Sequence, residues 1–117
     1  MDIGIFTRAG TISPQEARRR MRKSAHTLLD VRTAPEYEEQ RIDGAKLIPV
    51  DQLQRRAPAE LPDKHAPVFV YCRSGGRAAS AVQMLSGMGY TDAVSIGGIV
   101  NWPYETVKGV KEGQHVF

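Results

Sequence analysis

The chain has 117 residues, of which 41% are hydrophobic and 25% charged, which predicts a single folded domain over residues 1–117 with one core. One cysteine and three scattered histidines exclude an internal disulfide and offer no metal-ligand spacing. The net charge of +3 is too small for the dense basic surface of a dedicated nucleic-acid-binding protein. No apolar run approaches the roughly 20 residues of a membrane helix. We therefore expect a cytoplasmic protein that contacts neither nucleic acid nor membrane.

Short apolar runs alternate along the chain with amphipathic or capped segments. This rhythm is typical of βαβ units, in which a parallel sheet is covered by helices. We therefore predict an α/β fold with a mostly parallel, five-stranded sheet flanked by helices on both faces. The predicted strands are residues 4–7, 27–31, 45–48, 68–71 and 93–96.

Four helices are predicted between these strands. Segment 13–16 has a serine N-cap, a proline at the first helical position and a glutamate three residues after the serine, so it predicts a helix to about residue 23. Segment 33–36 carries a similar but weaker start. Asp51 is predicted to cap a third helix through about residue 56. A fourth helix is predicted to begin near Arg77 and to end at the glycines that follow its apolar face.

The segment over residues 68–80 holds the pattern that indicates chemistry. A buried strand runs into Cys72, followed by a glycine-containing loop and a helix. Backbone N–H groups of the loop and the start of the helix should converge on the sulfur and favour its thiolate form. Gly75 and Gly76 are expected to supply the positive φ angles of such a loop. A buried structural cysteine would not need a glycine-containing loop and a helix start directed at its sulfur. We therefore interpret Cys72 as a nucleophile.

The loop Cys72-Arg73-Ser74-Gly75-Gly76-Arg77 resembles the active-site loop of the rhodanese (thiosulfate sulfurtransferase) superfamily. Three further segments follow in the family's order, so that the resemblance covers about residues 12–102 and leaves the tail 103–117 unassigned. Two departures lie outside the loop: Arg41 replaces the family's usual histidine, and Pro103 directly follows the tryptophan. The further segments are LDVR at 29–32 with PEY at 35–37, IDGA at 42–45 leading to 48–49, and Gly97-Gly98 with Trp102.

The resemblance implies a two-step sulfur transfer that needs no cofactor. The Cys72 thiolate would take the outer sulfur of thiosulfate as a persulfide, and an acceptor would then remove it. Cyanide, a thiol, a thioredoxin-like protein or another sulfur-using protein are the expected acceptors. The alternative is a relay module in which Cys72 carries sulfur delivered by a partner protein, with little turnover of thiosulfate. We expect a monomer or a weak homodimer.

Loop length separates this chemistry from that of oxyanion-binding relatives. The spacing Cys72-x4-Arg77 is one residue shorter than the Cys-x5-Arg loop with which phosphatase-like members surround a tetrahedral anion. A phosphatase or arsenate reductase activity is therefore disfavoured. The lack of a second cysteine also counts against arsenate reductases that form an internal disulfide.

Candidate roles around Cys72 follow from charge and position. Substrate binding is assigned to the loop residues Arg73, Ser74, Gly75, Gly76 and Arg77, and to Arg32 at the end of a neighbouring strand. Arg73 is predicted to bind the anionic donor, whereas Arg77 either contacts substrate or holds the loop's shape. Asp30 and Glu36 are predicted to form supporting ion pairs with Arg77 or Arg32 rather than to act as acid or base.

Two features outside the loop receive structural interpretations. The basic run 18–23 is predicted to be the solvated face of a helix, with docking of an acidic partner as the alternative. Trp102 is predicted to be a packing residue near the end of the sheet.

Overall fold

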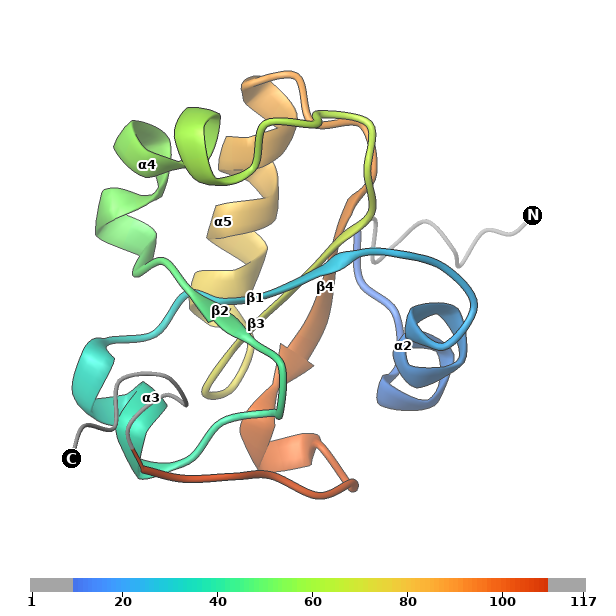
Figure 1. Ribbon diagram of the computed structural model, residues 1–117, viewed down its shortest axis with the longest axis vertical. Helices are drawn as coiled ribbons and strands as arrows, with labels where there is room; N and C mark the ends of the chain where they lie inside the picture. Colours follow the sequence, from blue (N-terminus) through green and yellow to red (C-terminus); the bar gives the residue numbers. More distant parts are fainter. Residues whose placement is uncertain (1–9, 110–117) are drawn as a thin grey trace, which may run out of the picture.

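A parallel sheet forms the centre of the computed structural model, which describes residues 10–109. Its order is β2-β1-β3-β4, and every neighbouring pair is parallel. The strands are β1 (Thr27–Asp30), β2 (Lys46–Leu47), β3 (Val68–Cys72) and β4 (Ala93–Gly98), shown in Figure 1. The α/β prediction is confirmed, but the described residues form four strands instead of five. The expected strand at 4–7 lies outside them, and Thr11 adds only an isolated bridge to Ser95.

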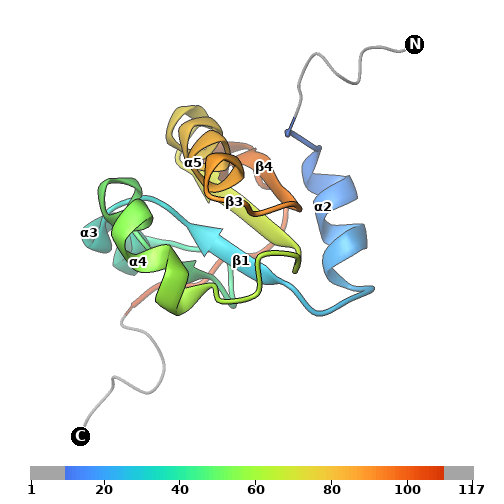
Figure 2. The same cartoon turned by 90° about the horizontal axis from the view of Figure 1, so that it is seen from above.

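Helices cover both faces of this sheet, as predicted. The view from above shows α4 and α5 on one face and α2 on the other (Figure 2). Short 3₁₀ turns, η1 (Val50–Gln52) and η2 (Ile99–Asn101), precede α4 and follow β4. The helices are α2 (Pro14–Met21), α3 (Ala34–Glu39), α4 (Leu53–Glu60) and α5 (Gly76–Gly87).

The first two helices start where their capping residues predict. The Ser13 hydroxyl accepts the Glu16 N–H at 3.1 Å, with a proline at the first helical position. In α3 the Thr33 hydroxyl accepts the Glu36 N–H while the Glu36 carboxylate accepts the Thr33 N–H, which forms a complete capping box. The cap therefore fixes Glu36 at the beginning of α3.

The predicted start of the third helix at Asp51 is wrong. Asp51 lies within the 3₁₀ turn, no side chain caps either this turn or α4, and α4 begins at Leu53. The helix also continues past residue 56 and through Pro58. The missing cap and the internal proline both destabilise this helix. Burial of its apolar face against α5 compensates for that loss. Tertiary packing has overridden the local signals here.

The strand that leads to the cysteine alternates between two cores. Val68 and Val70 face the cluster beneath α4 and α5, whereas Phe69 and Tyr71 face the cluster on the α2 side. The same alternation places Cys72 on the α5 side, at the carboxyl edge of the sheet. Position along β3 thus aims the sulfur at the start of α5.

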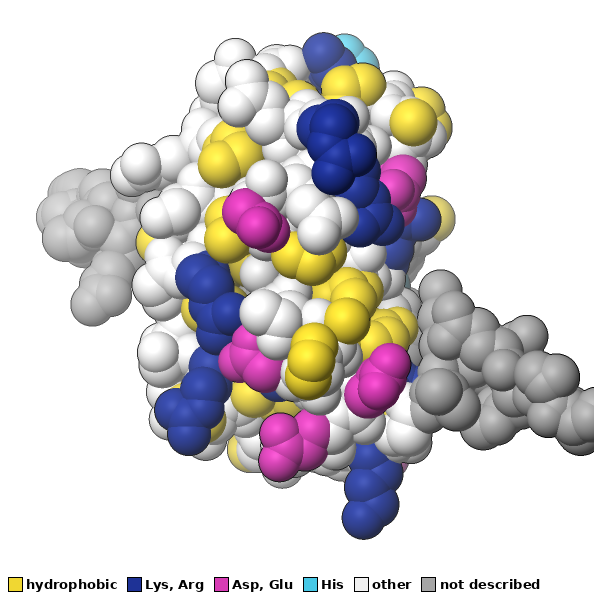
Figure 3. Space-filling model, turned by 90° about the vertical axis from the view of Figure 1, so that its left-hand side faces the viewer, with side chains coloured by type: hydrophobic (Ala, Val, Ile, Leu, Met, Phe, Trp, Pro, Cys, Tyr) yellow, Lys and Arg dark blue, Asp and Glu magenta, His cyan; other side chains and the backbone are white. Residues whose placement is uncertain are grey.

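The surface beside α3 and α4 mixes both signs of charge. Basic and acidic side chains are interspersed over this side, which is turned toward the viewer in Figure 3.

Among residues 10–109, no helix has the length and apolar character needed to cross a bilayer.

Candidate active site around Cys72

Cys72 ends β3 with its side chain almost completely buried, at 1% exposure. Its Sγ accepts two backbone N–H groups, from Gly75 at 3.0 Å and from Ala78 at 3.3 Å. One donor belongs to the loop and the other to the first turn of α5, so loop and helix converge on the sulfur. Oriented N–H groups of this kind stabilise negative charge on the atom they surround.

The two glycines of the loop have different conformations. Gly75 has φ +118°, a left-handed conformation in which a side chain would be strained. Gly76 is the first residue of α5 and does not have a positive φ, so that part of the prediction is wrong. A Cβ at Gly76 would meet no atom within 4 Å, so the loop turns on Gly75 alone.

Arg77 forms a two-pronged ion pair with Glu36. The two guanidinium nitrogens donate to the two carboxylate oxygens at 2.9 and 3.0 Å and so join α5 to α3. Hydrogen bonds from Arg77 lower the pKa of Glu36 to about 2, and those to Glu36 raise the pKa of Arg77. Of the two roles predicted for Arg77, this geometry favours holding the loop's shape.

Arg32 forms a buried pair with Asp30, and its guanidinium lies over the ring of Tyr71, the residue before Cys72, at 5.5 Å. Its Nε and one terminal nitrogen donate to the carboxylate at 2.9 and 2.7 Å, and the same terminal nitrogen also donates to the Gln40 carbonyl. Burial opposes the charge on Arg32, but the Asp30 hydrogen bonds and charge raise the pKa of Arg32 above its ordinary value. Within the described residues, no hydrogen bond or ion pair joins this pair to the Cys72 loop. The substrate-binding role of Arg32 stays a prediction.

Arg73 and Ser74 form the exposed outer part of the loop. Across residues 10–109, the Arg73 guanidinium has no ion-pair partner, in contrast to Arg32 and Arg77. Its main chain is anchored, because the Arg73 carbonyl accepts the Val100 N–H at 3.2 Å. Arg73 therefore combines a fixed backbone with a charge that is available to an anion arriving at the loop.

The end of β4 supplies residues that sequence reasoning did not assign to the site. Gly97 and Gly98 lie directly against the Cys72 loop, and the Ser95 hydroxyl accepts the Gly97 N–H at 3.0 Å. The two adjacent glycines at the end of an expected strand were the available signal. Their sequence alone does not say which backbone approaches them.

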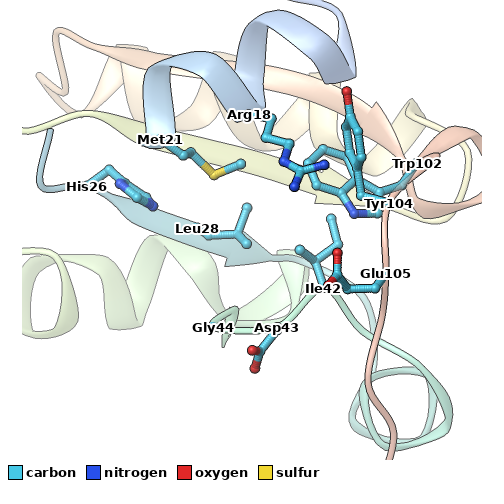
Figure 4. Close-up of a pocket in the computed structure, with 10 residues that line it drawn as sticks. All are labelled: Arg18, Met21, His26, Leu28, Ile42, Asp43, Gly44, Trp102, Tyr104 and Glu105. Atoms are coloured by element: carbon cyan, nitrogen blue, oxygen red, sulfur yellow. The ribbon is translucent and has the colours of Figure 1, made fainter. Parts of the chain in front are cut away.

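A separate hollow of about 280 Å³ lies between α2 and the segment after β4 (Figure 4). Met21, Leu28 and Trp102 are among its lining residues, and Arg18 stacks over the ring of Tyr104 at 4.1 Å. It contains no residue of the loop at 72–77 and no nucleophilic thiol. The candidate nucleophile, the Cys72 sulfur, therefore lies outside this hollow. In the described part of the chain, no three His, Cys, Asp or Glu side chains gather as a metal would require.

The chain is similar in sequence and in fold to known proteins. The family model of the rhodanese-like domain matches residues 13–104. Thiosulfate sulfurtransferase PspE of Escherichia coli K12 is 35% identical over 86 residues, which cover 74% of this chain and 83% of PspE. The probable adenylyltransferase/sulfurtransferase MoeZ of Mycobacterium tuberculosis H37Rv is 39% identical over 106 residues, 86% of this chain but 26% of MoeZ. The solved structure of the human single-domain sulfurtransferase TSTD1 has a TM-score of 0.72 at 29% identity, covering 80% of this chain and 95% of that one.

Proposed function

The chain belongs to the rhodanese-like domain family, and from that premise we propose that it is a thiosulfate sulfurtransferase that works through a persulfide on Cys72. Sulfurtransferase function is supported by relatives that carry that name, PspE among them. The observation that carries the proposal is the Cys72 sulfur, held between the N–H groups of Gly75 and Ala78.

In the first step the Cys72 thiolate attacks the outer sulfur of thiosulfate. A bond forms between Sγ and that sulfur, the sulfur–sulfur bond of thiosulfate breaks, and its electron pair leaves with sulfite. The dianionic donor is attracted by the Arg73 guanidinium, which is the cation of the loop without an ion-pair partner among the described residues. The persulfide carries its negative charge beside the N–H donors of the loop.

In the second step a thiophilic acceptor attacks the outer sulfur of the persulfide. The bond to Sγ breaks, its electron pair stays on Cys72, and the thiolate is restored. Neither step requires a general acid, in keeping with the commitment of Glu36 to Arg77.

The alternative is a relay domain that receives its sulfur from a partner protein. It is supported by the match to MoeZ, of which this chain spans about a quarter, so that domains of this kind also occur within a larger protein. Comparing thiosulfate with a persulfidated donor protein separates the two, because a relay domain turns over slowly with thiosulfate alone.

The proposal is tested by assaying sulfur transfer from thiosulfate to cyanide with the wild type and the variant Cys72→Ser. We expect the variant to lose essentially all transfer, because a hydroxyl stays protonated and cannot store sulfur. Circular dichroism and the melting temperature control for folding. Turnover retained by the folded variant would refute a mechanism through Cys72.

A further inference from the structure

The last strand of the sheet contains an irregularity beside the cysteine. Val70 pairs with Ser95 and Cys72 pairs with Gly98, so two residues of β4 stand opposite the single residue Tyr71 of β3. Gly97 has φ +87°, and its N–H is held by the Ser95 hydroxyl. A glycine in this conformation is typical of a β-bulge, which bends a strand and redirects the residue after it.

The bulge brings the bare Cα of Gly98 against the backbone of the Cys72 loop. A Cβ placed on Gly98 would lie 2.5 Å from the Cα of Ser74 and closer still to the carbonyl oxygen of Arg73. Real Cβ contacts essentially never fall below 3.0 Å. Both obstructing atoms belong to the backbone, so no side-chain rotation can relieve the overlap.

Gly98 does not need to be glycine for its own conformation. Its φ of −127° and ψ of 153° are those of an ordinary extended residue, which any amino acid adopts. Gly97 differs, because its left-handed φ favours glycine although a Cβ there would meet nothing within 4 Å. At Gly98 the requirement is therefore close approach to the loop and nothing else.

Two neighbouring contacts fix the loop against the same segment. The Val100 N–H donates to the Arg73 carbonyl at 3.2 Å, and a Cβ on Gly75 would come within 3.8 Å of the Gly97 Cα. The segment 97–100 therefore lies along one side of the loop. Only two residues separate Cys72 from Gly75, so a shift at Arg73 or Ser74 moves the N–H that points at the sulfur.

We propose that Gly98 is a positioning residue for the Cys72 loop, whose missing side chain lets the loop come close enough to aim the Gly75 and Ala78 N–H groups at the sulfur. The expected effect of Gly98 on turnover rests on the proposed function. The expected effect on the reactivity of the Cys72 sulfur is independent of that function, because alkylation measures thiolate reactivity without any sulfur donor.

The direct test is the variant Gly98→Ala. Strand β4 is tied to β3 by its ladder, so the loop yields to the added methyl group and its N–H groups leave the sulfur. We expect the kcat of sulfur transfer to fall on the order of 10²-fold, as for an ångström-scale displacement of a preorganised site. The rate of alkylation by iodoacetamide should also reach half its maximum at a higher pH than in the wild type.

Two further variants make the test specific. Gly87→Ala at the end of α5 adds the same methyl group where it meets nothing within 4 Å, and both readouts should match the wild type. Ser95→Ala removes the hydroxyl that holds the Gly97 N–H and adds no atom. It should shift both readouts in the same direction as Gly98→Ala, by several-fold, and it covers the case in which Gly98→Ala does not fold.

The outcomes separate this inference from the proposed function. A folded Gly98→Ala protein with wild-type kcat and a wild-type alkylation profile would overturn the positioning role. If Gly98→Ala does not fold, an unchanged Ser95→Ala protein would overturn it instead. A wild type that does not turn over thiosulfate, combined with a shifted alkylation profile in Gly98→Ala, would leave the inference standing and remove the proposed donor.

Discussion

Three arginines near the site have different surroundings, which indicate different roles. Arg32 is buried with Asp30, Arg77 is paired with Glu36, and Arg73 is exposed with its backbone anchored. Their charge and their positions at the loop and at the end of a neighbouring strand predict that all three could contact a substrate. Burial and ion pairing are tertiary properties, and they are the reason we propose Arg73 as the contact for the donor.

Replacing this arginine, in Arg73→Ala, should weaken thiosulfate binding by about 1.5–3 kcal/mol, the usual contribution of a hydrogen bond to a charged group. This corresponds to a rise in the KM for thiosulfate of roughly 10- to 160-fold. Steady-state kinetics measures it, with Arg55→Ala on the exposed side of α4 as the matched control. An unchanged KM would make Arg73 an ordinary surface residue.

Individual residues of the site were predictable to different degrees. Cys72 and Gly75 follow from the local pattern of strand, cysteine, glycine and helix. The helical conformation of Gly76 depends on where α5 begins, and the need for glycine at 98 depends on a chain segment more than twenty residues away. A local pattern carries no information about such an approach.

At the scale of elements, the Cys72 loop is braced by α3. Glu36 serves both the capping box of its own helix and the ion pair with Arg77 at the start of α5. The ion pair is partly exposed, so its direct contribution to stability is modest. Its main consequence is that α3 is tied to the start of α5, directly after the loop.

Removing this charge, in Glu36→Gln, should destabilise the fold by about 0.5–1 kcal/mol at neutral pH. The pKa of Glu36 is lowered to about 2 from 4.5, so its stabilisation is complete above pH 4.5 and is lost as the pH falls toward 2. The free energy of unfolding of wild type and variant, measured from pH 7 to 2, should therefore converge at the acid end.

Glu60→Gln is the matched control for this variant, because Glu60 forms a comparable pair with Arg56 in α4. Both variants should lose similar stability, but only Glu36→Gln should slow sulfur transfer, by several-fold. Equal transfer rates in the two variants would show that the brace does not act on the loop.

The length of the loop between β3 and α5 predicts sulfur rather than phosphorus chemistry. Inserting one glycine between Gly75 and Gly76 should widen the loop, move its N–H donors and reduce sulfur transfer on the order of 10²-fold. Affinity for phosphate, measured by calorimetry, should rise. Efficient hydrolysis of an aryl phosphate by the unmodified protein, or unchanged transfer after the insertion, would contradict the role of loop length.

At the scale of the whole molecule, a parallel sheet explains why distant segments meet at Cys72. The carboxyl ends of β1, β3 and β4 lie at one edge of the sheet, so the segments near residues 30–36, 72–78 and 97–100 gather there (Figure 1). The alternation of apolar and capped segments predicts the parallel sheet and places residues 30–36 near the loop, but it does not predict the approach of residues 97–100. It could not predict the course of α4 through Pro58, because burial against α5 decides it.

In the proposed mechanism, Cys72 stores sulfur taken from thiosulfate. The most direct measurement is the intact mass of the purified protein after exposure to excess thiosulfate, with and without subsequent cyanide. We predict a gain of the mass of one sulfur atom, absent in Cys72→Ser, and its loss when cyanide is added. A wild-type mass that does not change in excess thiosulfate would contradict the claim.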